Sequence, residues 1–76
     1  MRYALRNKRK EARLTQGEVA KALHISRPTY CKIENGTTDP SLALALRIAA
    51  FFNCSVEDLF SDNKFFDVKS PTEHIA

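Results

Sequence analysis

The stretch LTQGEVAKALHISRPTYCKIENG, residues 14–36, contains two short helix patterns joined by a corner of about three residues. Thr15 and Glu18 have the spacing of a capping box, in which each side chain accepts an unpaired backbone N–H at the helix start. Ser26 is a second residue of the N-cap type. Gly36 is the expected C-terminal stop, because glycine adopts the left-handed conformation easily. The stretch therefore predicts a helix-turn-helix unit.

Basic residues are concentrated in the half of the chain that holds this unit. The net charge of the 76 residues is +3, but residues 1–35 carry nine Lys and Arg against three Asp and Glu, whereas residues 36–76 carry three against six. A run of positive charge alone usually marks a solvated helix face. Because the charge coincides here with the helix-turn-helix pattern, we expect double-stranded DNA as the partner.

The remaining pattern predicts an all-α fold with a single small core. Five helices are expected, at about residues 3–13, 16–23, 27–35, 40–52 and 55–60. Asp39 is the expected N-cap of the fourth helix, and Pro40 its first residue. Residues 1–60 would form a DNA-binding domain. Residues 61–76 would form a short C-terminal tail, with a β-strand near Phe65–Lys69 as a dimerisation element.

Other classes of protein are not expected from the sequence. The two cysteines, Cys31 and Cys54, do not form a CxxC pair, and neither histidine has helical spacing to them, so we predict neither a disulfide nor a metal site. No nucleophile has a base and an orienting group nearby in the pattern, so we expect no catalytic residue and no enzyme. No cofactor or small-molecule ligand is indicated. The absence of a secretory or membrane-spanning pattern favours a cytoplasmic protein that does not contact a membrane.

Residues 5–60 resemble the phage-repressor or XRE-type helix-turn-helix family. The resemblance rests on an ordered set of residues: Arg9, Leu14-Thr15-Gln16, Val19-Ala20, Leu23, Ile25-Ser26, Ile33-Glu34-Asn35-Gly36, Pro40-Ser41-Leu42, Ala49 and Ser55. It implies an ion pair between Arg9 and Glu34 that ties the first helix to the end of the third. It also implies that Gln16 contacts a DNA phosphate and braces the recognition helix.

Two positions depart from the family pattern. His24 stands at the corner, where the family usually has glycine, and a positive φ there would cost His24 about 1 kcal/mol. A metal-ligand or pH-switch role for His24 is the weaker alternative. Pro28 stands where the family often has a long polar residue that contacts a base. Proline cannot donate a hydrogen bond to a base, so it would stiffen the helix start or pack on a thymine methyl group.

DNA recognition would depend on few side chains. Arg27 and Lys32 can donate to guanine O6 and N7, and Thr29 lies between them; for Arg27 the alternative is an ordinary surface charge. Phosphate contacts position a protein without reading sequence. They are expected from Gln16, Asn35, Thr37 and Thr38. For the two threonines, ordinary loop polarity is an equal alternative.

The fourth helix is apolar nearly all round, with one charge in residues 42–52, so it needs cover on more than one face. The domain itself would cover the face formed by Leu42, Ala45, Ala49 and Phe52. We expect a homodimer interface that contains Leu44, Phe51, Leu59, Phe60, Phe65, Phe66 and Val68. In the alternative, the tail folds back over these residues within one subunit. A two-fold axis would place two recognition helices one DNA turn, ~34 Å, apart and require a palindromic operator.

These expectations combine into one function. The chain is expected to be a sequence-specific double-stranded DNA-binding transcriptional regulator, and repression by a homodimer on a palindromic operator is what the family resemblance implies. The alternative is an antitoxin-like or adaptor module that uses the same fold for protein interaction. A duplex-binding assay at several salt concentrations separates the two, because only phosphate neutralisation gives a steep dependence on salt.

Overall fold

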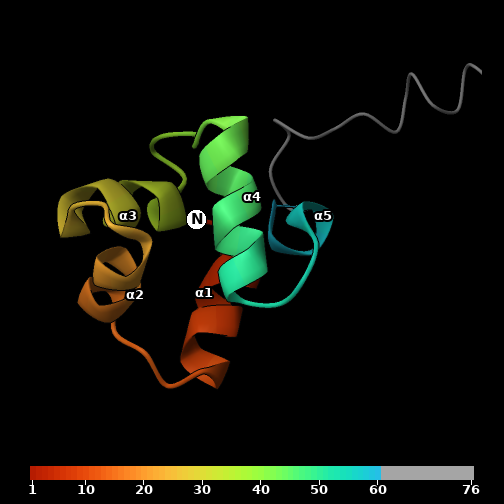
Figure 1. Ribbon diagram of the computed structural model, residues 1–76, viewed down its shortest axis with the longest axis horizontal. Coiled ribbons are helices and arrows are strands. Elements are labelled where there is room, and N and C mark those ends of the chain that lie inside the picture. Colours follow the sequence, from red (N-terminus) through yellow and green to blue (C-terminus); the bar gives the residue numbers. More distant parts are fainter. Residues whose placement is uncertain (61–76) are drawn as a thin grey trace, which may run out of the picture.

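The computed structural model describes residues 1–60, which form five helices and no strand (Figure 1). The helices are α1 (Tyr3–Glu11), α2 (Gln16–Leu23), α3 (Arg27–Asn35), α4 (Leu42–Phe51) and α5 (Val56–Phe60). The predicted all-α class is confirmed for this part of the chain. The predicted tail strand, with Phe65, Phe66 and Val68, lies outside the described residues. Across residues 1–60, every helix is too short or too polar to cross a membrane.

Side-chain caps set the starts of α2 and α3. Thr15 and Glu18 form the predicted capping box: the Glu18 N–H donates to the Thr15 hydroxyl over 3.1 Å, and the Thr15 N–H donates to the Glu18 carboxylate over 2.8 Å. The Ser26 hydroxyl accepts the N–H of Thr29 over 3.2 Å. Gly36 ends α3 with a φ of 83°. Each such cap contributes about 1 kcal/mol, so the two helices of the motif are specified locally.

The start of α4 differs from the prediction. Ser41 is the N-cap, and its hydroxyl accepts a backbone N–H three residues further on over 3.1 Å. The helix therefore begins at Leu42 and not at Pro40, which is buried in the preceding loop. Asp39, the predicted cap, forms an ion pair with the buried Arg2. The Asp39 carboxylate thus binds Arg2, which is distant in the sequence, and does not cap α4.

One core lies between the five helices. Its buried apolar residues are Leu5, Val19, Ala20, Leu23, Tyr30, Ile33, Ala45, Ile48, Ala49, Leu59 and Phe60. The helices α2 and α3 pack on each other at the left of Figure 1, and α5 lies on the other side of the molecule against α1 and α4. The chain start lies beside the end of α3 (Figure 1). This arrangement leaves the outer side of the α2–α3 pair free of other helices.

Two expectations about apolar residues do not hold. Leu59 and Phe60, expected at a dimer interface, are fully buried within the subunit, because α5 packs them against α1 and α4. Leu42, expected in the core, is 66% exposed. It is the first residue of α4, and the helix enters the core only one turn later, at Ala45. The exposed apolar surface of α4 therefore includes Phe51, as expected, but also Leu42 and Leu46.

Candidate nucleic-acid interface

The third helix has one buried side and one exposed side. Tyr30, Ile33 and Glu34 are buried. The exposed side carries every α3 residue that the sequence analysis predicted to contact DNA, namely Arg27, Pro28, Thr29, Lys32 and Asn35. Pro28, Lys32 and Asn35 are four and three residues apart, a spacing that places them in one row along the helix. All five suggested residues of α3 are thus exposed, and three of them form one row.

Arg27, the first residue of α3, lies over the start of α2. A Cβ atom added to Gly17 would lie 3.7 Å from the Cδ of Arg27. The aliphatic part of Arg27 therefore packs on the first turn of α2, while the residue as a whole stays exposed. Thr29 is less free than the sequence suggested, because its hydroxyl lies 2.7 Å from that of the N-cap Ser26. A base contact by Thr29 would have to share that hydroxyl or use the methyl group.

The corner between the two helices is closed by backbone and side-chain bonds. His24 is left-handed, with φ of 60° and ψ of 40°, as expected for a position that usually holds glycine. The N–H of Ile25 donates to the carbonyl of Ala20 over 3.0 Å. Arg47 of α4 donates to the carbonyl of Leu23. These bonds give partners to the carbonyls of Ala20 and Leu23 in the last turn of α2 and so stabilise the corner.

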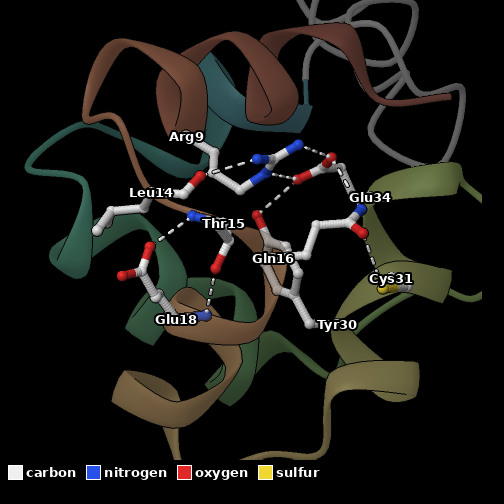
Figure 2. Close-up of polar contacts among 8 residues, drawn as sticks. All are labelled: Arg9, Leu14, Thr15, Gln16, Glu18, Tyr30, Cys31 and Glu34. Atoms are coloured by element: carbon white, nitrogen blue, oxygen red, sulfur yellow. Dashed lines mark hydrogen bonds and ion pairs between the residues drawn. The ribbon is translucent and has the colours of Figure 1, made fainter.

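A hydrogen-bond network fixes the back of α3 to α1 and α2 (Figure 2). Glu34 is 1% exposed, and its carboxylate accepts the Arg9 Nε over 2.8 Å and Nη2 over 2.9 Å. The hydroxyl of Tyr30 donates to the same carboxylate over 2.9 Å, and Nε2 of Gln16 donates over 3.2 Å. The ion pair that the family resemblance implied is present, and it is bidentate, the geometry that makes such pairs strong.

The surroundings of Glu34 also set the charge states of the network. Burial raises the pKa of Glu34, but hydrogen bonds from Arg9, then Tyr30, and then Gln16 outweigh it and leave the pKa below the usual value. The bond to Glu34 raises the pKa of Arg9. Burial, followed by the bond to Glu34, raises the pKa of Tyr30. Near neutral pH the glutamate is therefore ionised, the arginine is charged and the tyrosine is neutral.

Gln16 belongs to this network through both ends of its amide. While its Nε2 donates to Glu34, its Oε1 accepts the thiol of Cys31 over 3.0 Å (Figure 2). Gln16 thereby joins the start of α2 to the middle and end of α3, which agrees with the bracing role that the resemblance implied. Since an amide nitrogen carries two hydrogens, one remains for a phosphate. The geometry is thus compatible with both roles expected of Gln16, the bracing of α3 and the contact with a DNA phosphate.

The loop after α3 carries two further nominated residues. Thr37 and Thr38 are exposed. Their backbone N–H groups donate to the carbonyl of Lys32, over 2.9 Å and 3.3 Å, so these donors are used within the protein. The carbonyl of Thr38 accepts a hydrogen bond from Arg2 over 3.0 Å. Of the N–H and hydroxyl groups of Thr37 and Thr38, the two hydroxyls are therefore the donors that could contact a phosphate.

The sequence did not single out Arg2. Its side chain is 2% exposed, and its acceptors lie 31 to 37 residues further along the chain. Nothing in MRYALRNKRK distinguishes this arginine from the other basic residues around it. Only contacts across the fold identify it.

Within residues 1–60, the residues that the sequence suggested for the dimer interface differ in their exposure. Leu44 is partly buried against the core, and Phe51 is 39% exposed. Larger apolar exposure occurs at Leu42 and at Leu46, which is 54% exposed and lies one turn further along α4. Within residues 1–60, no group of three or more His, Cys, Asp and Glu could hold a metal ion.

Comparisons with known proteins agree with this geometry. A family model described as helix-turn-helix matches residues 5–59. An uncharacterised HTH-type transcriptional regulator from Methanocaldococcus jannaschii is 53% identical over 47 residues, which cover 62% of this chain and 71% of the relative. Another from Archaeoglobus fulgidus is 43% identical over 60 residues, covering 79% of this chain and 86% of the relative. The cryptic phage CTXphi transcriptional repressor RstR from Vibrio cholerae is 33% identical over 60 residues, covering 79% of this chain and 54% of the relative.

Proposed function

The chain belongs to the helix-turn-helix family of DNA-binding transcriptional regulators, and on this basis we propose that it represses transcription by binding a palindromic operator as a homodimer. The observation that carries the proposal is the division of α3 into an exposed polar side and a side bonded to α1 and α2. A helix held in this way can enter the major groove without losing its position.

Base recognition is assigned to the exposed side of α3. Arg27 and Lys32 are cationic donors suited to the guanine acceptors O6 and N7. Pro28 stands between them on the same surface and would contribute an apolar contact to a thymine methyl group or a rigid helix start. A base contact by Thr29 is less favoured, because its hydroxyl is hydrogen-bonded to that of Ser26.

Phosphate contacts are assigned to the ends of the motif. Gln16 stands at the start of α2, where unpaired N–H groups and the helix dipole favour an anion. Asn35, Thr37 and Thr38 stand at the end of α3 and in the loop that follows. Contacts at both ends would fix the register of α3 in the groove.

Repression and dimerisation have separate support. Repression is supported by the phage relative, which is named a transcriptional repressor. Dimerisation is supported by the apolar side chains that α4 exposes, Leu42, Leu46 and Phe51. The interface proposed here combines this surface and Leu44 with Phe65, Phe66 and Val68 of the tail. A repressor of this kind would act by occluding a promoter.

Selection of binding sites from random DNA duplexes by the full chain tests the proposal. We expect enrichment of an inverted repeat whose half-sites lie about one DNA turn apart, and affinity that falls steeply with salt. An Arg27→Ala/Lys32→Ala variant should lose the enrichment. Lys10→Ala, which removes an exposed charge from α1, should keep it. Weak binding without sequence preference or salt dependence would refute the proposal and favour an antitoxin-like or adaptor module.

A further inference from the structure

The N-terminal arginine makes contacts that a surface residue would not make. The side chain of Arg2 is 2% exposed. Its Nη1 donates to the carbonyls of Ile33 and Thr38, and its Nη2 forms an ion pair with Asp39. The guanidinium carbon lies 5.4 Å from the centre of the Phe60 ring, within the range of a cation–π contact. Arg2 therefore joins the chain start to α3, the following loop and α5.

These contacts hold the loop between α3 and α4 from one side. The backbone N–H of Arg2 donates to the carbonyl of Glu34 over 2.8 Å, so main chain and side chain of Arg2 both reach the end of α3. On the other side, the N–H groups of Thr37 and Thr38 donate to the carbonyl of Lys32. A cation at a helix C-terminus is favourable, since the last carbonyls have no partner within the helix. The loop is thus tied to α3 on one side and to Arg2 on the other.

We propose that Arg2 is a positioning residue for DNA binding. It sets the loop at residues 36–39 so that the hydroxyls of Thr37 and Thr38 meet a phosphate of the DNA backbone. The inference rests on the proposed DNA-binding function. Arg2 itself does not touch DNA, because its guanidinium is enclosed by protein acceptors and an aromatic ring. It therefore differs from the exposed cations of the N-terminal half, whose effect on DNA would be direct.

Replacement of the arginine gives the first test. Arg2→Met keeps the volume and the apolar stem but removes the donors. We expect it to weaken binding to all duplexes by about tenfold, the equivalent of one lost hydrogen bond to a charged group. The slope of affinity against salt should stay unchanged, because a buried cation releases no counterions. Lys10→Met is the matched control for loss of one positive charge from the same segment. A reduced slope for Arg2→Met would mean that Arg2 contacts phosphate directly and would overturn the inference.

Replacement of Asp39 gives a second test, in which the two explanations predict opposite changes in DNA affinity. Asp39→Ala removes a half-exposed negative charge, so long-range electrostatics alone would strengthen DNA binding. Loss of the Arg2 contact should instead weaken it. Tighter binding by Asp39→Ala would contradict the positioning role. This variant removes a half-exposed side chain and leaves Arg2 with its two carbonyl acceptors, and DNA binding is measured where thermal melts show the variant to be folded, so it stays informative if Arg2→Met folds poorly.

A double-mutant cycle separates positioning from a general effect on stability. Thr38→Val removes the hydroxyl at nearly constant volume and should weaken binding in the natural chain. In the Arg2→Met background the same change should have little further effect, because the hydroxyl is already misplaced. Additive losses, measured below the melting temperature of each variant, would overturn the inference.

A measurement without DNA distinguishes the two proposals. Arg2→Met should speed amide hydrogen exchange at Thr37 and Thr38 and leave α2 unchanged. If the natural chain does not bind duplex DNA, the proposed function fails and the DNA-binding role of Arg2 fails with it, while exchange still shows whether Arg2 holds the loop. If the natural chain binds DNA and Arg2→Met binds equally well, the positioning inference alone is refuted.

Discussion

Arg9 and Glu34 are 25 residues apart in the sequence and form two hydrogen bonds of 2.8 Å and 2.9 Å, with exposed fractions of 12% and 1%. The carboxylate also accepts from Tyr30 and Gln16, so both of its oxygens have two donors. Removing a carboxylate from water is unfavourable, and this set of donors offsets that cost. The pair therefore joins α1 to the end of α3 through a buried, fully hydrogen-bonded carboxylate.

Removing one member of this pair should destabilise the fold strongly. Arg9→Met or Glu34→Leu alone leaves an uncompensated charge in the network and should lower the free energy of unfolding by about 3–5 kcal/mol. The double variant should recover part of that loss, because neither charge remains. Urea denaturation of the four proteins measures the coupling. Small, additive losses from the single variants would show that the pair contributes little.

The same carboxylate predicts how stability depends on pH. The folded-state pKa of Glu34 is lowered, so its stabilising contribution is present above its unfolded pKa of about 4.3 and is lost as pH falls through the folded value. Glu34→Gln cannot titrate at this position. The difference in unfolding free energy between the natural chain and Glu34→Gln should therefore shrink on acidification below about pH 4. Denaturation curves measured at several pH values test this, and a difference that does not vary with pH would contradict it.

The corner residue offers a stabilising substitution. His24 has a φ of 60°, a conformation that glycine adopts without a side-chain penalty. His24→Gly should raise the free energy of unfolding by about 1 kcal/mol without changing DNA affinity. Asn53→Gly is a matched comparison, because Asn53 has a φ of 58° and asparagine tolerates this region better than histidine. Thermal melts should show the larger gain for His24→Gly, and equal gains would refute the argument.

Arg27 and Gln16 should differ in how their loss affects binding. Arg27→Ala should cost about 1–3 kcal/mol on the best operator and relax the preference at one base pair. Gln16→Ala should weaken binding to all duplexes by similar factors. Competition between the operator and single-base variants measures both effects. If Arg27→Ala lowers affinity uniformly, Arg27 is a phosphate contact and the assignment is wrong.

The oligomeric state tests the proposed interface. Sedimentation of the full chain should show a dimer at micromolar concentration, and a chain truncated after Asp62 should show whether the tail takes part. Leu46→Ser and Phe51→Ser should weaken the dimer. Tyr3→Ser, which removes comparable exposed apolar surface from α1, should not. A monomeric full chain would exclude the dimer, and a truncated chain that still dimerises would leave α4 as the contact.

Much of the motif could be predicted because its determinants are local. The capping box of Thr15 and Glu18, the cap at Ser26 and the stop at Gly36 each involve residues within about four positions of one another. Such interactions form in the same way wherever the helix lies in the fold. The exposed side of α3 also follows from helical periodicity once the helix boundaries are known. The pairing of Arg9 with Glu34 was available from the family resemblance and not from spacing.

The tertiary structure decided the features that depend on distant partners. Two residues, Asp39 and Ser41, both have side chains able to cap α4, and the sequence offers no way to choose between them. Ser41 caps α4, while the Asp39 side chain binds Arg2, which lies 37 residues earlier in the sequence. In the same way, an apolar pattern shows that Leu59 and Phe60 need burial but not which surface buries them. Burial is a property of the assembled helices, and only their packing placed these two side chains inside the subunit and Leu42 outside it.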